Sequence, residues 1–150
     1  MSVKQLSVFL ENKPGTLRTV TSVLAEKKIN LRALSLADSA DFGVLRLIVD
    51  QPDLTVSVLK ELKFPVNVTE VIAVEMDDTP GGLDGVLKVL EGENINIEYM
   101  YAFIGSKTRK ALVIFRVDKI QAAIESLLKN GIKLVSTEED IADIIYYCWD

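Results

Sequence analysis

Residues 11–17 read ENKPGTL, and this stretch decides the fold because it occurs twice. The second copy, DDTPGGL, occupies residues 77–83, and Pro80 follows Pro14 by 66 positions. The match continues at the same offset on both sides of the turn, where LSV (6–8) corresponds to IAV (72–74) and INL (29–31) to INI (95–97). The chain is therefore a tandem repeat.

Each copy reads as an apolar strand, a polar turn with Pro-Gly and an amphipathic helix. Such a turn leaves backbone N–H groups free at a helix N-terminus, where they can hold an anionic group. We therefore expect the two turns to be the functional parts of the chain and the remaining elements to position them.

The repeat also fixes the number of domains. A length of 150 residues allows one average domain or two small ones. The repeat decides for two, which we place at residues 1–69 and 70–150. Each is close to the lower size limit for an independent core, so we expect the two domains to bury surface against each other.

Composition and charge restrict the class of protein. With 49% hydrophobic and 26% charged residues, the chain is typical of a soluble globular protein. Its apolar runs are too short for a membrane span, and residues 1–5 contain no signal-peptide core. The single cysteine, Cys148, excludes an internal disulfide and favours a reducing, cytoplasmic location. The net charge of −5 argues against nucleic acid as a partner, since phosphate backbones call for a basic face.

Hydrophobic periodicity predicts the same order of elements in both halves. In the first half we expect a strand over 3–11, a helix over 16–28, strands over 31–38 and 43–50, a helix between Pro52 and Pro65, and an apolar strand over 66–76. In the second half we expect a helix over 83–92, strands over 95–104 and 110–117, a helix over 119–130, a strand over 132–135 and a short tail helix after about residue 136.

The stretch 66–76 must provide the last strand of the first unit and the first strand of the second. One long strand shared between the units would satisfy the pattern, and so would a tight kink near Thr69 and Glu70. The sequence leaves both arrangements open.

The order βαββαβ, repeated twice, predicts an α+β fold of two ferredoxin-like units. With right-handed crossovers, each unit is a four-stranded antiparallel sheet with two helices on one face. The second strand of each unit then lies at a sheet edge, and exposed edges tend to be paired. We therefore expect the strands 31–38 and 97–104 to join the two sheets side by side into eight strands.

Aromatic side chains line one face of the strand 95–104; they are Tyr99, Tyr101 and Phe103. They either pack across the open sheet face or shape a pocket for a particular side chain, and packing is favoured because half-buried strands commonly carry aromatic residues. Leu34 and Met100 point to the opposite face, so we expect them in the core under the helices.

Taken together, the Pro-Gly turn, the Ile-Asn pair after the first helix, the βαββαβ order and the duplication resemble the ACT domain, a small regulatory module that binds amino acids. The resemblance covers nearly the whole chain, except for the tail after about residue 136. The second copy departs from the first by carrying Asp78 in place of Asn12.

In this family, ligands bind where the turn of one domain faces the second strand of its neighbour. The resemblance implies a first site of Asn12, Lys13, Pro14, Gly15, Thr16 and Leu17 with Asn96 and Ile97. It implies a second site of Asp78, Thr79, Pro80, Gly81, Gly82 and Leu83 with Asn30 and Leu31. Amide N–H groups at 15–17 or 81–83 would hold the α-carboxylate, and the Asn or Asp side chains and strand carbonyls would accept the α-ammonium.

Asn12 and Asn30 also have structural interpretations, the first as a helix N-cap and the second as a residue that closes a helix. Their recurrence at positions 78 and 96 favours the functional one. The charge of Asp78 should favour an ammonium group more than Asn12 does, so we expect the two sites to differ in affinity.

The chain contains no histidine, nucleophile motif, phosphate-binding glycine loop or metal-ligand cluster, so no catalytic residue, cofactor or metal is predicted. We expect a non-catalytic amino-acid sensor. One alternative is a regulatory subunit that docks on an amino-acid biosynthetic enzyme without binding a ligand, and a second is a small enzyme on the same fold. The helix-free face of each sheet needs cover, which favours a homodimer.

Overall fold

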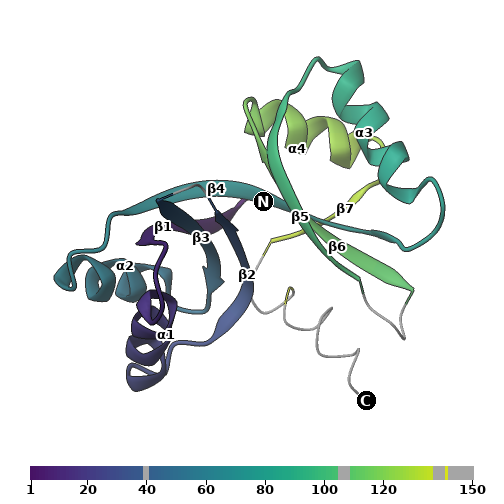
Figure 1. Ribbon diagram of the computed structural model, residues 1–150. Helices are drawn as coiled ribbons and strands as arrows, with labels where there is room; N and C mark the ends of the chain where they lie inside the picture. The colour runs from purple at the N-terminus through teal and green to yellow at the C-terminus, as the bar shows by residue number, and fades with distance from the viewer. Residues whose placement is uncertain (39–40, 105–108, 137–140, 142–150) are drawn as a thin grey trace. The chain divides into compact units, whose positions relative to one another are not determined.

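The computed structural model describes residues 1–38, 41–104, 109–136 and 141 (Figure 1). In chain order its elements are β1 (Val3–Glu11), α1 (Thr16–Glu26), β2 (Leu31–Asp38), β3 (Phe42–Val49), α2 (Pro52–Glu61), β4 (Val66–Asp77), α3 (Gly82–Gly92), β5 (Ile97–Ile104), β6 (Lys110–Val117), α4 (Ile120–Lys129) and β7 (Lys133–Val135). This order confirms the predicted α+β class with two βαββαβ units. The predicted tail helix and Cys148 lie outside the described residues.

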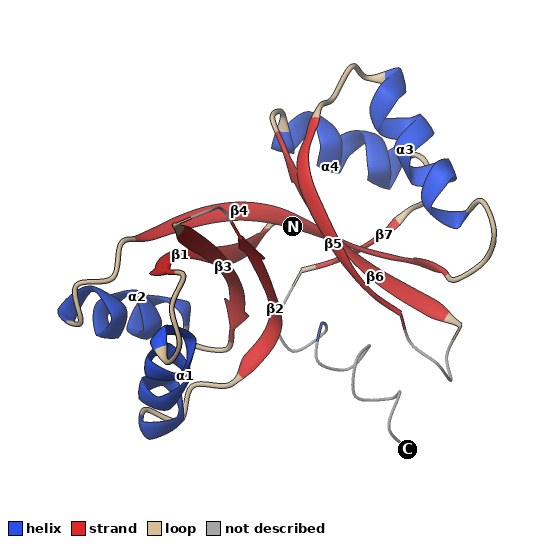
Figure 2. Cartoon of the chain, viewed as in Figure 1, coloured by secondary structure: helices blue, strands red, loops and turns tan. Residues whose placement is uncertain are grey.

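The chain forms two compact units, one of Lys4–Thr69 and one of Glu70–Asp150 together with Met1–Val3. In each unit the two helices lie on the same side of the strands (Figure 2). None of the helices within the described ranges is both long and apolar enough to cross a membrane.

The core of each unit forms where alternating strand residues meet the apolar stripe of the helices. The buried core of the first unit consists of Leu6, Val8, Leu10, Val20, Leu24, Ile29, Leu45, Leu47, Val49 and Leu59. That of the second consists of Ile72, Val74, Val86, Leu90, Ile95, Val113, Phe115, Val117, Ala123, Ile124, Leu127 and Leu134. The same strand and helix positions supply both cores, as the repeat predicts.

The strands are hydrogen bonded in the order β2-β3-β1-β4-β6-β5, and β7 pairs with β4. The first unit therefore has the order β2-β3-β1-β4, and the second has the equivalent order β5-β6-β4-β7. The long strand β4 belongs to both, because it runs without interruption from Val66 to Asp77 across the boundary between Thr69 and Glu70. Of the two arrangements that the sequence left open, the shared strand is the one observed.

The prediction that strands 31–38 and 97–104 pair with each other is wrong. The two sheets are joined through β4, and β2 and β5 stand at opposite ends of the strand order. Sharing β4 also gives seven strands instead of the predicted eight. The physical reason is that no linker separates the two units. The chain therefore continues as one strand, β4, whose backbone groups form hydrogen bonds with strands of both units.

The edge position of β2 and β5 also corrects the placement of Leu34 and Met100. Both face the side that carries the helices, since their cross-strand partners Leu47 and Phe115 belong to the buried cores. Their exposed fractions are nevertheless 46% and 36%. The expectation that they belong to the core is wrong because the helices do not cover the outermost strand.

The aromatic side chains of β5 lie on the opposite face of that strand. Tyr101 and Phe103 pair with Ile114 and Leu112 of β6, which alternate with the helix-facing residues. Their rings meet edge to face, with centroids 6.2 Å apart and an interplanar angle of 86°. These two rings therefore contact each other on the face of the strand opposite the helices.

Candidate functional site

Both Pro-Gly turns lead into a helix through a glycine in the left-handed conformation. Gly15 precedes α1 with a φ of 89°, and Gly81 precedes α3 with a φ of 85°. Residues with a side chain rarely adopt this conformation, which explains the glycine in both copies. These glycines are the N-cap residues, and neither helix has a side-chain cap. The interpretation of Asn12 as a helix N-cap is therefore wrong.

The backbone hydrogen bonds of the two turns match one for one. The N–H of Thr16 donates to the carbonyl of Lys13 at 3.4 Å, and the N–H of Gly82 donates to that of Thr79 at 3.0 Å. The N–H groups of Thr19 and Gly85 donate to Gly15 and Gly81, both at 3.0 Å. The repeat in sequence is thus a repeat in geometry.

The turns are also anchored in the same way at their start. The N–H of Asn12 donates to the carbonyl of Asp41 at 3.0 Å, and that of Asp78 donates to Arg109 at 2.8 Å. The side chains of Asn12 and Asp78 remain exposed. Each turn is therefore tied to the hairpin of its own unit while its polar side chain stays accessible.

Two amide groups in each first helical turn have no acceptor among the described residues: those of Leu17 and Arg18 in α1, and of Leu83 and Asp84 in α3. The N–H of Thr16 or Gly82, which the sequence also offers as an anion donor, is already used within the turn. The free donors lie at the positive end of the helix dipole, where a carboxylate is stabilised.

Each turn borders a pocket that lies within one unit. The pocket of the first unit has a volume of about 640 Å³ and is lined by Phe9, Glu11, Lys13, Pro14, Gly15, Thr16, Thr19, Phe42, Leu62, Lys63, Phe64 and Pro65. The pocket of the second unit has about 620 Å³ and is lined by Glu75, Met76, Asp77, Thr79, Pro80, Gly81, Gly82, Gly85, Val86, Val89, Lys110, Asn130, Gly131, Ile132 and Lys133. Every lining position of the first has its repeat counterpart in the second. We call them the first and second turn pockets.

The turn pockets contain only part of each predicted site. The residues at positions 13–16 and 79–82 line them, whereas Asn12, Leu17, Asp78 and Leu83 lie in the same turns outside the lining. The wall supplied by the segment after the second helix of each unit was not predicted from the sequence. The sequence signal was Gly131, a glycine of the kind that often follows a helix; in the structure both Lys63 and Gly131 have positive φ, at 63° and 74°.

The electrostatic character of the two turn pockets differs. At the end of the β1–β3 ladder, Glu11 lies opposite Phe42, which carries no charge. The Glu11 carboxylate forms its ion pair with the Lys13 ammonium within the turn, at 2.7 Å. At the equivalent place Asp77 is paired with Lys110, and the two side chains form an ion pair. Hydrogen bonding and attraction to the Asp77 carboxylate raise the pKa of Lys110 above its ordinary value of 10.5.

Asn30 and Asn96 have a structural role at the start of β2 and β5. The N–H of Asn30 donates to Oδ1 of Asp50 at 2.9 Å, and the Asp50 N–H donates back to the Asn30 carbonyl at 3.2 Å. Asn96 and Asp118 repeat this exchange at 3.0 and 3.2 Å. The interpretation of Asn30 as a helix-closing residue is wrong, because α1 ends at Glu26 with Lys27 as its C-cap, and the bridge to Asp50 was not predicted. The sequence feature that marks this bridge is the Val-Asp dipeptide, which occurs at positions 49–50 and again at 117–118.

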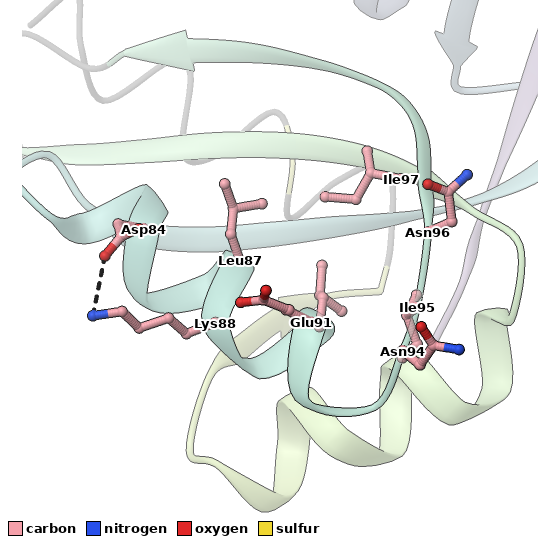
Figure 3. Close-up of a pocket in the computed structure, with 9 residues that line it drawn as sticks. Asp84, Leu87, Lys88, Glu91, Asn94, Ile95, Asn96 and Ile97 are labelled. Atoms are coloured by element: carbon pink, nitrogen blue, oxygen red, sulfur yellow. Dashed lines mark ion pairs between the residues drawn. The ribbon is translucent and has the colours of Figure 1, made fainter.

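Within one unit the turn and the Asn-Asp bridge are separated, because the turn precedes the first helix and the asparagine follows it. Asn96 and Ile97 instead line a third pocket of about 460 Å³ beside α3 (Figure 3). Its lining includes the ion pair between Asp84 and Lys88, with 3.2 Å between Oδ2 and Nζ. Among the described residues, no cluster of three or more His, Cys, Asp or Glu residues is arranged to hold a metal ion.

A family model for the ACT domain pair matches residues 1–145 of the chain. A crystal structure of a protein from Bacteroides thetaiotaomicron is 43% identical, superposes with a TM-score of 0.88 and covers 95% of this chain and 96% of that one. No protein of curated function matches the sequence.

Two further structures share the fold at much lower identity. The ligand-free regulatory subunit of aspartate kinase from Thermus thermophilus is 14% identical, with a TM-score of 0.62 and coverage of 84% of this chain and 91% of that chain. The corresponding subunit from Thermus flavus is 12% identical, with a TM-score of 0.58 and coverage of 84% and 90%.

Proposed function

Because the chain belongs to the family of ACT domain pairs, we propose that it is a non-catalytic regulatory protein that binds a free amino acid at its Pro-Gly turns. The observation that carries this proposal is the repeated turn pocket, with unpaired amide N–H groups in the adjoining helical turn. Both pockets have volumes within the range of small-molecule sites, which is roughly 300–1,000 Å³.

The chemistry of the turns suits an amino acid. A carboxylate can accept hydrogen bonds from the free N–H groups of Leu17 and Arg18 and gains from the helix dipole. The exposed side chains of Asn12 and Asp78 offer oxygen acceptors for an ammonium group. Since Asp78 is charged and Asn12 is not, the two turns should bind with unequal affinity.

The proposed site keeps the second-strand residues that the family resemblance implies. Asn30 and Leu31 at the start of β2, and Asn96 and Ile97 at the start of β5, remain proposed ligand-binding residues. The Asn-Asp bridges hold the asparagine backbones, and both asparagine residues are exposed.

A regulatory role agrees with the use of the same fold in the Thermus thermophilus protein, which is a regulatory subunit of aspartate kinase. The family model that matches describes an ACT domain pair alone. For this chain we propose that the amino acid binds one conformation more tightly than another and so shifts their populations, which is the thermodynamic requirement for allosteric control.

The proposal is tested by thermal denaturation in the presence of each of the twenty amino acids, with hits confirmed by titration calorimetry. A ligand at a hundred times its Kd should raise the unfolding free energy by about 2.7 kcal/mol. Asn12→Ala and Asp78→Ala should each weaken one class of site. If no amino acid changes the melting temperature, the sensor proposal is wrong.

The alternative function is a regulatory subunit that docks on an amino-acid biosynthetic enzyme without a ligand of its own. It is favoured by apolar side chains on the edge strands, where Leu36 is 52% exposed and Ile104 is 69% exposed. Cross-linking in cells followed by affinity purification would test it. Recovery of such an enzyme, together with no amino-acid response, would support docking over sensing.

A further inference from the structure

The two turn pockets are built by equivalent elements but have different walls. The lining segments are the end of the first strand, the Pro-Gly turn, the first turn of the helix, the start of the third strand and the segment after the second helix. Because these backbones correspond, differences between the pockets arise from side chains, and the side chains have diverged.

Aromatic and aliphatic side chains form one part of the wall of the first turn pocket, beside the charged residues Glu11, Lys13 and Lys63. Phe9 comes from β1, Phe42 from the start of β3, and Leu62, Phe64 and Pro65 from the segment after α2. Phe42 and Leu62 are left 52% and 44% exposed. Removing such apolar surface from water is favourable, at about 25 cal/mol per Å², so an apolar ligand group would be attracted to these walls.

Charged side chains occupy the same positions in the second turn pocket. Glu75 replaces Phe9, Lys110 replaces Phe42 and Lys133 replaces Pro65. Lys110 binds Asp77, and the Lys133 ammonium binds the Glu75 carboxylate at 2.9 Å. An apolar group entering here would have to remove these charges from water or separate them, which is unfavourable.

A buried polar atom also distinguishes the first turn pocket. The Thr16 hydroxyl oxygen is buried and has no hydrogen-bond partner among the described residues, and Thr16 is part of the lining. Buried polar atoms are normally paired, so this one is a candidate to bind a polar group of a ligand. At the equivalent position the second pocket has Gly82 and therefore no hydroxyl.

From these differences we infer that the first turn pocket takes the large apolar side chain of the bound amino acid in preference to the second turn pocket, whose wall combines these ion pairs with Met76, Val86, Val89 and Ile132. The inference rests on the proposed function and names its ligand class: amino acids such as leucine, methionine or phenylalanine, in preference to small or charged ones. Thr16 and the Glu11–Lys13 pair provide polar contacts at the pocket for the ligand's backbone groups.

The test is titration calorimetry of the full chain with leucine, phenylalanine, serine and aspartate. We expect one molecule of a large apolar amino acid per chain at the first turn pocket, with at least tenfold weaker binding of serine and aspartate. Phe42→Lys installs the residue of the second pocket opposite Glu11, and it should weaken the apolar amino acid at least tenfold.

A second variant is needed because Phe42→Lys could weaken binding by disturbing the fold. Leu62→Asn installs the counterpart of Asn130 on an exposed side chain and should weaken binding severalfold. Its matched control is Leu54→Asn, within α2 and 40% exposed but outside the lining, which should leave the affinity within twofold of the unsubstituted chain. Circular dichroism verifies the fold of each variant.

The outcomes separate the two proposals. Preferential binding of serine or aspartate would overturn this inference while supporting the proposed function, and so would unchanged binding in both Phe42→Lys and Leu62→Asn. Two equal apolar sites per chain would also overturn it. Binding of no amino acid by the unsubstituted chain would overturn both proposals.

Discussion

Gly82 and Gly85 lie three residues apart, and a methyl group would meet different surroundings at each. A Cβ at Gly82 would lie 2.4 Å from the carbonyl oxygen of Asp77, closer than any real contact of this kind. A Cβ at Gly85 would meet no atom within 4 Å. Gly82 is therefore required by close backbone approach, whereas Gly85 is not.

We expect Gly82→Ala to destabilise the protein by about 1–3 kcal/mol, because the turn must shift to admit the methyl group. Gly85→Ala should stabilise it by about 0.5–1 kcal/mol through the better helix propensity of alanine. Urea denaturation of both variants provides the measurement, each serving as the control for the other. Equal effects in the two variants would contradict the assignment of close approach at Gly82.

The helices and strands could be predicted because their signals are local. Proline and glycine in residues 13–16 and 79–82 mark turns by their own backbone preferences, and the apolar period identifies each element. Pairing between elements is not local. Both a shared strand and a kink fit the alternating stretch 66–76, and no local signal in that stretch favours one over the other. The pairing of β2 with β5 was mispredicted for the same reason.

The candidate sites were predictable only in part. The residues of the Pro-Gly turns are contiguous in sequence and were identified together. Phe9, Phe42 and Phe64 reach the first turn pocket from three separate elements, and nothing in the sequence alone brings them together. Such non-local walls depend on strand order and on the path of the chain after α2.

The end of the β4–β6 ladder offers a prediction about pH. Since the pKa of Lys110 is raised above 10.5 by Asp77 in the folded protein, the stabilisation from this pair is present below pH 10.5 and is lost as the pH rises through the folded-state pKa. In NMR titration of the Lys110 Nζ, Asp77→Asn should lower the pKa back toward 10.5. An unchanged pKa in the variant would mean that the ion pair is not the cause.

The strand β4 joins the two units, because its 12 residues contribute hydrogen-bonding partners to the strands of both. We expect calorimetric unfolding to show a single transition, because disorder in one half of a continuous strand propagates into the other. Insertion of two glycines between Thr69 and Glu70 should divide this transition into two.

The same insertion between Glu93 and Asn94, in the loop between α3 and β5, serves as the control. It should lower the melting temperature without dividing the transition. Two transitions in the unmodified chain would show that the units unfold independently despite sharing a strand.

The shared strand also fixes which of its alternating side chains point toward the two cores. Val66 packs against the core of the first unit, and Ile72, Val74 and Met76 belong to or pack against the core of the second, so the even-numbered side chains of β4 serve both. If one residue were lost or gained between Val66 and Ile72, the core side chains of one unit would point to the opposite face of the sheet. A change of two residues would preserve the alternation. The spacing between the repeats is therefore constrained to even steps, a restriction that a flexible linker would not impose on evolution.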